Sequence, residues 1–70
     1  MIAVFKTDIQ DPQQAQFISG MLSSRVPGIR INFDLEDCDR ILRIKEISES
    51  SLDEVIFQVQ EYGFQCEILH

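Results

Sequence analysis

Cys38, Cys66 and His70 are the residues of this 70-residue chain best suited to nucleophilic or soft-metal chemistry. A reactive cysteine needs a base or a cation beside it, because only the thiolate attacks or binds a metal. Cys38 stands in the acidic segment 36–39, where neighbouring carboxylates disfavour a thiolate. Cys66 falls at an apolar position, which is typical of a buried small hydrophobe. We expect no disulfide and no Cys–His site, and a redox or metal role for Cys38 stays open.

The charge balance narrows the classes of function. Twelve acidic residues against six basic ones give a net charge of −6. Such a field repels phosphate backbones, and no run of Lys and Arg with interleaved aromatics is present, so we expect no nucleic-acid partner. No stretch approaches the ~20 apolar residues of a membrane span, and no secretory signal is visible. The missing signal and the two cysteines without a disulfide framework predict a cytoplasmic protein. No acid–base pair, activated nucleophile or cofactor loop can be assembled, so we expect no enzymatic activity and no cofactor.

Four segments predict β-strands. Residues 2–7 are rich in β-formers, and residues 29–36 alternate strictly between apolar and polar side chains. After the polar tip of that strand, residues 40–46 predict a third strand, and residues 64–69 predict the last one. The alternation gives each of the three later strands one apolar face, formed by Ile29, Ile31, Phe33, Leu35, Leu42, Ile44, Phe64, Cys66 and Ile68.

A first helix is predicted between the first two strands. Asp11 can cap its free N–H groups, Pro12 suits its first position, and Gln14 can complete a capping box. The segment 26–28, Val-Pro-Gly, ends the helix. Its predicted apolar stripe consists of Ala15, Phe17, Ile18, Met21 and Leu22.

A second helix is predicted before the last strand. Ser51 and Glu54 have the spacing of a capping box, and Gly63 suits the left-handed position that follows a helix. Its predicted apolar stripe consists of Leu52, Val55, Ile56, Val59 and Tyr62.

The element order β-α-β-β-α-β predicts a single α+β domain over residues 1–70. Right-handed crossovers favour a four-stranded antiparallel sheet with both helices on one face, the ferredoxin-like arrangement. This topology brings the first loop and the turn between strands two and three to one end of the sheet. The acidic residues expected there are Asp8, Asp11, Glu36, Asp37 and Asp39. One interpretation makes them caps and solvated turn residues, and the other makes them a docking surface for a basic protein partner.

Three short segments carry a likeness to a known family: 26–29 (Val-Pro-Gly-Ile), 34–36 (Asp-Leu-Glu) and 62–64 (Tyr-Gly-Phe). They match the Leu-Pro-Gly-Val, Asp-Leu-Glu and Gly-Tyr segments of heavy-metal-associated domains. The chain resembles this family of small copper chaperones and ATPase modules over nearly all of its 70 residues. The resemblance implies the same fold.

The metal motif of that family is Met-x-Cys-x-x-Cys in the first loop, where two thiolates suit a soft ion such as Cu(I). Counting back from the Pro-Gly pair places Gln10 at the methionine position and Pro12 and Ala15 at the two cysteine positions. Neither proline nor alanine has a side chain that coordinates a metal. The resemblance therefore does not carry metal binding to this loop.

The strand register of the family implies that Ala3, Phe5 and Thr7 face the helices. The outward set is then Ile2, Val4, Ile47 and Leu69. A contiguous apolar set of this kind suggests a homodimer or a contact with a protein partner. In the reverse register, Val4 belongs to the core instead.

These observations favour a non-catalytic domain with a metallochaperone-like fold that acts through protein contact. Two alternatives remain open. One is a divergent metal-binding or metal-transport accessory protein that uses Cys38 with acidic neighbours, or that binds metal between two copies. The other is a regulatory domain of the ferredoxin-like type that binds a small molecule.

Overall fold

The computed structural model describes residues 1–36 and 38–70, so every prediction that involves Asp37 lies outside the described residues. The elements are β1 (Ile2–Thr7), α1 (Pro12–Arg25), β2 (Arg30–Asp34), β3 (Ile41–Lys45), the short 3-10 helix η1 (Glu49–Ser51), α2 (Leu52–Glu61) and β4 (Cys66–Leu69). β1 has its predicted bounds. The other three strands are shorter than predicted at one or both ends.

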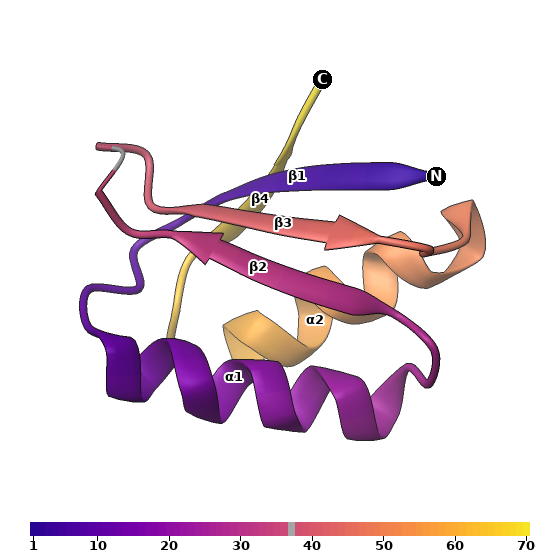
Figure 1. Cartoon of the computed structure of the whole chain (residues 1–70), viewed down its shortest axis with the longest axis horizontal. Coiled ribbons are helices and arrows are strands. Elements are labelled where there is room, and N and C mark those ends of the chain that lie inside the picture. The colour runs from indigo at the N-terminus through magenta and orange to yellow at the C-terminus, as the bar shows by residue number, and fades with distance from the viewer. Residues whose placement is uncertain (37) are drawn as a thin grey trace.

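The four strands form one sheet in the order β2-β3-β1-β4, and every neighbouring pair is antiparallel. β1 and β3 are central, and β2 and β4 form the edges. Both helices cover the same face of the sheet and leave the other face open (Figure 1). The ferredoxin-like fold predicted from the element order is therefore confirmed.

The start of α1 follows the predicted cap closely. Asp11 has an extended backbone, and its Oδ1 accepts a hydrogen bond from the Gln14 N–H at 2.9 Å. Pro12 occupies the first turn. The Gln14 side chain differs from the prediction, because its Oε1 accepts from the Gln10 N–H at 3.0 Å and not from that of Asp11. The side chain thus satisfies the N–H one residue further out than a capping box requires.

The buried face of α1 is narrower than the predicted stripe. Ala15, Ile18 and Leu22 are buried, whereas Phe17 is 54% exposed. Successive residues lie about 100° apart around a helix, so Phe17 falls beside the face that Ile18 and Leu22 share. The prediction that Phe17 belongs to the stripe was wrong.

The start of α2 also differs from the prediction. η1 precedes the helix directly, so Ser51 already has a helical backbone with φ −94° and ψ −6°. A side-chain cap needs an extended backbone at that residue, and Ser51 makes no such bond. Its hydroxyl lies 3.1 Å from that of Ser48 instead. The predicted capping box of Ser51 and Glu54 was wrong.

The end of α2 follows the predicted glycine. Gly63 has φ +90°, and its N–H donates to the Gln60 carbonyl at 3.0 Å. The Phe64 N–H donates to the Val59 carbonyl at 3.4 Å, which completes a Schellman motif. Because the helix ends at Glu61, the next residue leaves the apolar stripe.

That next residue is Tyr62, which is 44% exposed and was wrongly predicted to lie in the stripe. Its ring packs edge-to-face against Phe17 with the ring centroids 5.0 Å apart. Two aromatic residues that the sequence pattern assigned to the core therefore form a pair on the surface, between α1 and the end of α2.

The core fills the space between the sheet and the two helices. It consists of Ala3, Phe5, Ile9, Ala15, Ile18, Leu22, Leu42, Ile44, Ile47, Val55, Val59 and Cys66. The burial of Ala3 and Phe5 shows that β1 has the register implied by the resemblance, and not the reverse register. Ile9 lies in the first loop and is fully buried, although the sequence pattern did not single it out.

Ile47 was predicted to lie on the open side of the sheet and is only 2% exposed. The prediction extended the alternation of β3 beyond its end. Glu46 has a left-handed backbone with φ +59°, so the alternation stops there and the chain turns back toward the helices. The correction removes Ile47 from the predicted outward set.

Candidate functional site

The two thiols lie in different environments. Cys66 is 4% exposed at the start of β4, and burial raises the pKa of its thiol to about 12. Cys38 is exposed in the turn between β2 and β3. Both are free, and β3 and β1 lie between them in the sheet order. Within the described residues, no three His, Cys, Asp or Glu side chains gather closely enough to hold a metal ion.

Pro12 and Ala15, which the resemblance aligns with metal ligands, have structural roles here. Pro12 begins α1, and Ala15 is 7% exposed and packs in the core. These two positions therefore start the helix and fill space beneath the sheet.

The end of β1, from which the first loop continues, meets the turn between β2 and β3. The Thr7 N–H lies 3.2 Å from the carbonyls of both Asp39 and Arg40, and the Thr7 hydroxyl donates to the Arg40 carbonyl at 2.6 Å. We call this end of the molecule the loop end. It comprises the first loop (8–11), the β2–β3 turn (35, 36 and 38–40) and the α2–β4 connection (62–65) (Figure 1).

Three of the predicted docking acids are engaged within the loop end. Asp8 Oδ1 accepts the Gln65 N–H at 2.7 Å and so ties the first loop to the α2–β4 connection. Asp11 caps α1, and Asp39 Oδ1 lies 3.8 Å from Lys6 Nζ. Glu36 is exposed, and Asp37 lies outside the described residues. The structure thus assigns caps and turn contacts to these three carboxylates.

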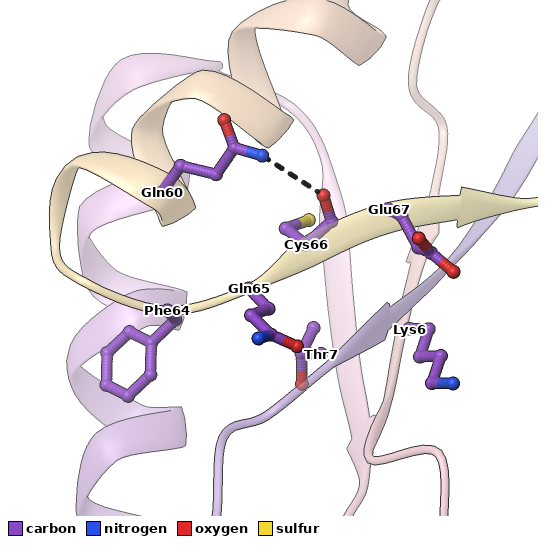
Figure 2. A pocket seen from close by; sticks show the side chains of 7 residues that line it. All are labelled: Lys6, Thr7, Gln60, Phe64, Gln65, Cys66 and Glu67. Atoms are coloured by element: carbon purple, nitrogen blue, oxygen red, sulfur yellow. Dashed lines mark hydrogen bonds between the residues drawn. The ribbon is translucent and has the colours of Figure 1, made fainter.

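A hollow of about 420 Å³ lies between the end of β1, the last turn of α2 and the start of β4 (Figure 2). Figure 2 shows Gln60 reaching from α2 to β4, where its Nε2 donates to the Cys66 carbonyl at 3.5 Å. The hydroxyl of Thr7, another residue of the wall, donates a hydrogen bond to the Arg40 carbonyl. The high pKa keeps the Cys66 thiol protonated near neutral pH. The hollow therefore offers space and polar walls, but its thiol is not activated.

The open face of the sheet carries a net positive charge, opposite in sign to the net charge of the whole chain. It is formed by the side chains that alternate away from the core, at Ile2, Val4, Lys6, Arg30, Asn32, Asp34, Ile41, Arg43, Lys45, Glu67 and Leu69. Ile41 differs from the others of this set in being buried, with 7% of its surface exposed. Four of the six Lys and Arg residues lie there, with two acids. The open face therefore carries +2 in a chain of −6, which leaves −8 on the rest.

Aliphatic side chains form the other part of the open face. Ile2 is 59% exposed and Leu69 is 38% exposed, while Val4 is half-buried between them. Val4 stands directly opposite Leu69 in the pairing of β1 with β4. The predicted outward positions of these three residues agree with the structure.

Sequence reasoning missed the four cations of the open face. Lys6, Arg30, Arg43 and Lys45 come from three separate strands, so no run of basic residues marks them. For Arg30, Arg43 and Lys45 the signal was the alternation of their strands, in which each occupies a polar position. Lys6 carries no such signal, because residues 2–7 do not alternate. Strand pairing then brings these polar positions together.

Neither helix of the described chain is both long enough and apolar enough to cross a membrane. Comparison of the sequence and structure with protein-family models, curated proteins and solved structures finds no significant match.

Proposed function

We propose that this chain is a non-catalytic protein-binding domain that contacts its partner through the open face of the sheet. The observation that carries the proposal is the exposed surface of Ile2, Val4 and Leu69, which no helix covers (Figure 1). Burying such a surface against a partner removes apolar area from water, which favours association.

The loop end is less suited to binding a partner, because its carboxylates already make contacts within the chain. Its carboxylates Asp8 and Asp11 accept backbone hydrogen bonds, and Asp39 faces Lys6. A basic partner would have to compete with these contacts. Binding at the open face competes with no contact of this kind at Ile2, Val4 or Leu69, whose side chains are apolar.

Site-specific photo-crosslinking in the source cells tests the proposal. A benzophenone amino acid replaces Leu69 on the open face, and the matched control places it at Gln16, an exposed position of α1. We expect a discrete crosslinked protein from position 69 and none from position 16. The same species from both positions, or none from either, would contradict binding through the open face.

The resemblance to heavy-metal-associated domains and the alternative of metal handling stay predictions. The raised pKa of Cys66 makes its thiolate costly near neutral pH, and a soft metal binds the thiolate. Titration with Cu(I) and Zn(II) under reducing conditions tests the alternative. Tight stoichiometric binding that is lost in Cys38→Ser would favour metal handling over protein binding.

The small-molecule alternative concerns the hollow beside β4. A ligand that binds only the folded state raises the melting temperature. Screening a panel of small metabolites by thermal shift, with Gln60→Ala as the matched variant, tests this alternative. A shift that disappears in the variant would favour ligand binding there.

A further inference from the structure

We propose that the segment docking on the open face is an acidic polypeptide that presents both carboxylate and aliphatic side chains on the face that meets the sheet. This inference rests on the function proposed above and adds the chemistry of the partner. It follows from three properties of the open face, namely the pairing of its cations, the absence of an ion pair at Arg43 and Lys45 among the described residues, and the register of these two with the aliphatic residues.

The cations of β2 and β3 are arranged unfavourably for folding. Arg30 stands directly opposite Lys45 in the register of the two strands, and Arg43 lies two residues before Lys45 on the same face. Like charges directly opposite each other destabilise an antiparallel pair. Arg30 has one nearby acid, since its Nε lies 3.6 Å from Glu46 Oε2, but both side chains are largely exposed and water screens the pair.

Arg43 and Lys45 make no ion pair or side-chain hydrogen bond with any residue that the structure describes. Lys6 differs, because it faces Asp39 at 3.8 Å and stands opposite Glu67. Figure 2 shows Lys6 and Glu67 as neighbours on adjoining strands. The open face therefore has a balanced corner at Lys6 and an unbalanced half on β2 and β3.

Each unbalanced cation of β3 lies beside an aliphatic residue of β1. Arg43 stands opposite Val4, which in turn stands opposite Leu69, and Lys45 stands opposite Ile2. Directly opposite side chains are about 5 Å apart at Cβ. A partner that meets both halves therefore needs carboxylates and aliphatic groups on one and the same face. In an extended segment only every second residue lies on that face, about 7 Å from the next, so carboxylate and aliphatic residues must take turns at every second position.

Three properties favour a polypeptide over other partners. The described strands place no aromatic ring on the open face, and single-stranded nucleic acids bind by stacking on such rings. The charge of −8 on the rest of the surface repels a long polyanion or an anionic membrane, whereas a short segment can stay on the open face. Two copies stacked face to face with the two-fold axis along β3 would set Arg43 and Lys45 against their own equivalents.

The test is an NMR titration of the ¹⁵N-labelled full chain with three synthetic peptides. In the first, every second residue is in turn Glu and Leu, with Ser between them, so that one face of the extended peptide carries both. The second peptide replaces each Glu by Gln, and the third replaces each Glu by Lys. We expect the Glu peptide to shift the amides of Val4, Arg43 and Lys45. Its affinity should fall at least about tenfold when ionic strength rises from about 0.01 M to about 0.15 M, because the screening length shortens from about 30 Å to about 8 Å.

Charge variants locate the binding. Arg43→Glu combined with Lys45→Glu should lower the affinity for the Glu peptide by about a hundredfold, since Arg43 and Lys45 would each make one direct charge contact with it. The matched control, Arg25→Glu at the exposed end of α1, changes the charge in the same direction and should leave the affinity within about twofold. The milder pair Arg43→Gln and Lys45→Gln gives the same comparison if the double Glu variant does not fold.

The outcomes separate this inference from the proposed function. Equal binding of the Gln peptide at the same amides would overturn the acidic preference and leave protein binding standing. Shifts caused only by oligouridylate or by phosphatidylserine vesicles would overturn both. Concentration-dependent shifts of the same amides without peptide, together with dimers in sedimentation, would identify a second copy as the occupant and overturn the acidic segment.

Discussion

At the loop end, Asp8 and Asp11 accept hydrogen bonds from backbone N–H groups of the chain itself. On the open face, Arg43 and Lys45 make no ion pair or side-chain hydrogen bond with the described residues. Both regions are charged, yet the carboxylates of the loop end hold the fold together, whereas Arg43 and Lys45 have no ion pair among the described residues. The comparison shows that the number of charges in a region says little about whether they are free to bind.

The largest expected effect concerns Cys66, which lies beneath the loop end. Its pKa rises from 9.0 to about 12 on burial. The unfolded chain loses this proton near pH 9 while the folded chain keeps it, so the unfolded state binds fewer protons at higher pH. The free energy of unfolding should therefore fall between pH 9 and pH 12, by on the order of 4 kcal/mol.

Urea denaturation across that pH range checks this expectation, with Cys66→Ala as the control that lacks the titrating group. The wild type should lose stability more steeply than the variant. Equal slopes would show that the folded chain does not bury the thiol. Cys38, which is exposed, should react rapidly with thiol reagents under conditions in which Cys66 is protected.

The apolar residues of the two regions allow the same comparison. Ile9 in the first loop is fully buried, whereas Ile2 on the open face is 59% exposed. Ile9→Ala should lower the free energy of unfolding by about 3 kcal/mol through lost burial and a cavity. Ile2→Ala should change it by less than about 0.5 kcal/mol. Thermal and urea unfolding measure the stability of both variants. Similar losses of stability would contradict the exposure of Ile2 on the open face.

The hydrogen bond of Asp8 is the next test of the loop end. Asp8→Ala removes the acceptor of the Gln65 N–H and should cost about 2 kcal/mol, as expected for a bond to a charged group. Asp8→Asn keeps an acceptor without the charge and should cost less. If both variants unfold like the wild type, Asp8 is a solvated acid and is available to a partner.

The two helix starts differ in a way that mutation can measure. Asp11→Ala removes the cap of α1 and should cost about 1 kcal/mol. Ser51→Ala removes a hydroxyl that caps nothing, so its effect should stay within about 0.5 kcal/mol. A loss at Ser51 as large as that at Asp11 would restore the predicted second capping box.

The smallest effect has the opposite sign and lies on the open face. Lys45→Glu replaces a like-charge pair with Arg30 by an opposite-charge pair and should raise the free energy of unfolding by about 0.5 kcal/mol. Lys45→Gln, which only removes the repulsion, should give a smaller gain. A destabilised Lys45→Glu variant would mean that Lys45 serves the fold, as the carboxylates of the loop end do.

The comparison of the two regions also separates what could be predicted from what could not. The cap of Asp11, the first-turn Pro12 and the helix end at Gly63 were predicted, because each depends on residues within one turn of the chain. The exposure of Phe17 and Tyr62 was not predicted, because their positions depend on where a helix ends and on which side it packs.

By itself the sequence determined the order of elements, the bounds of β1 and most of the core, since alternation and helical spacing are properties of neighbouring residues. Tertiary structure decided the rest. The left-handed backbone of Glu46 turned Ile47 inward, and the register of the strands brought Lys6, Arg30, Arg43 and Lys45 onto one face. Those four cations are up to 39 residues apart in the chain, so only strand pairing could make them neighbours.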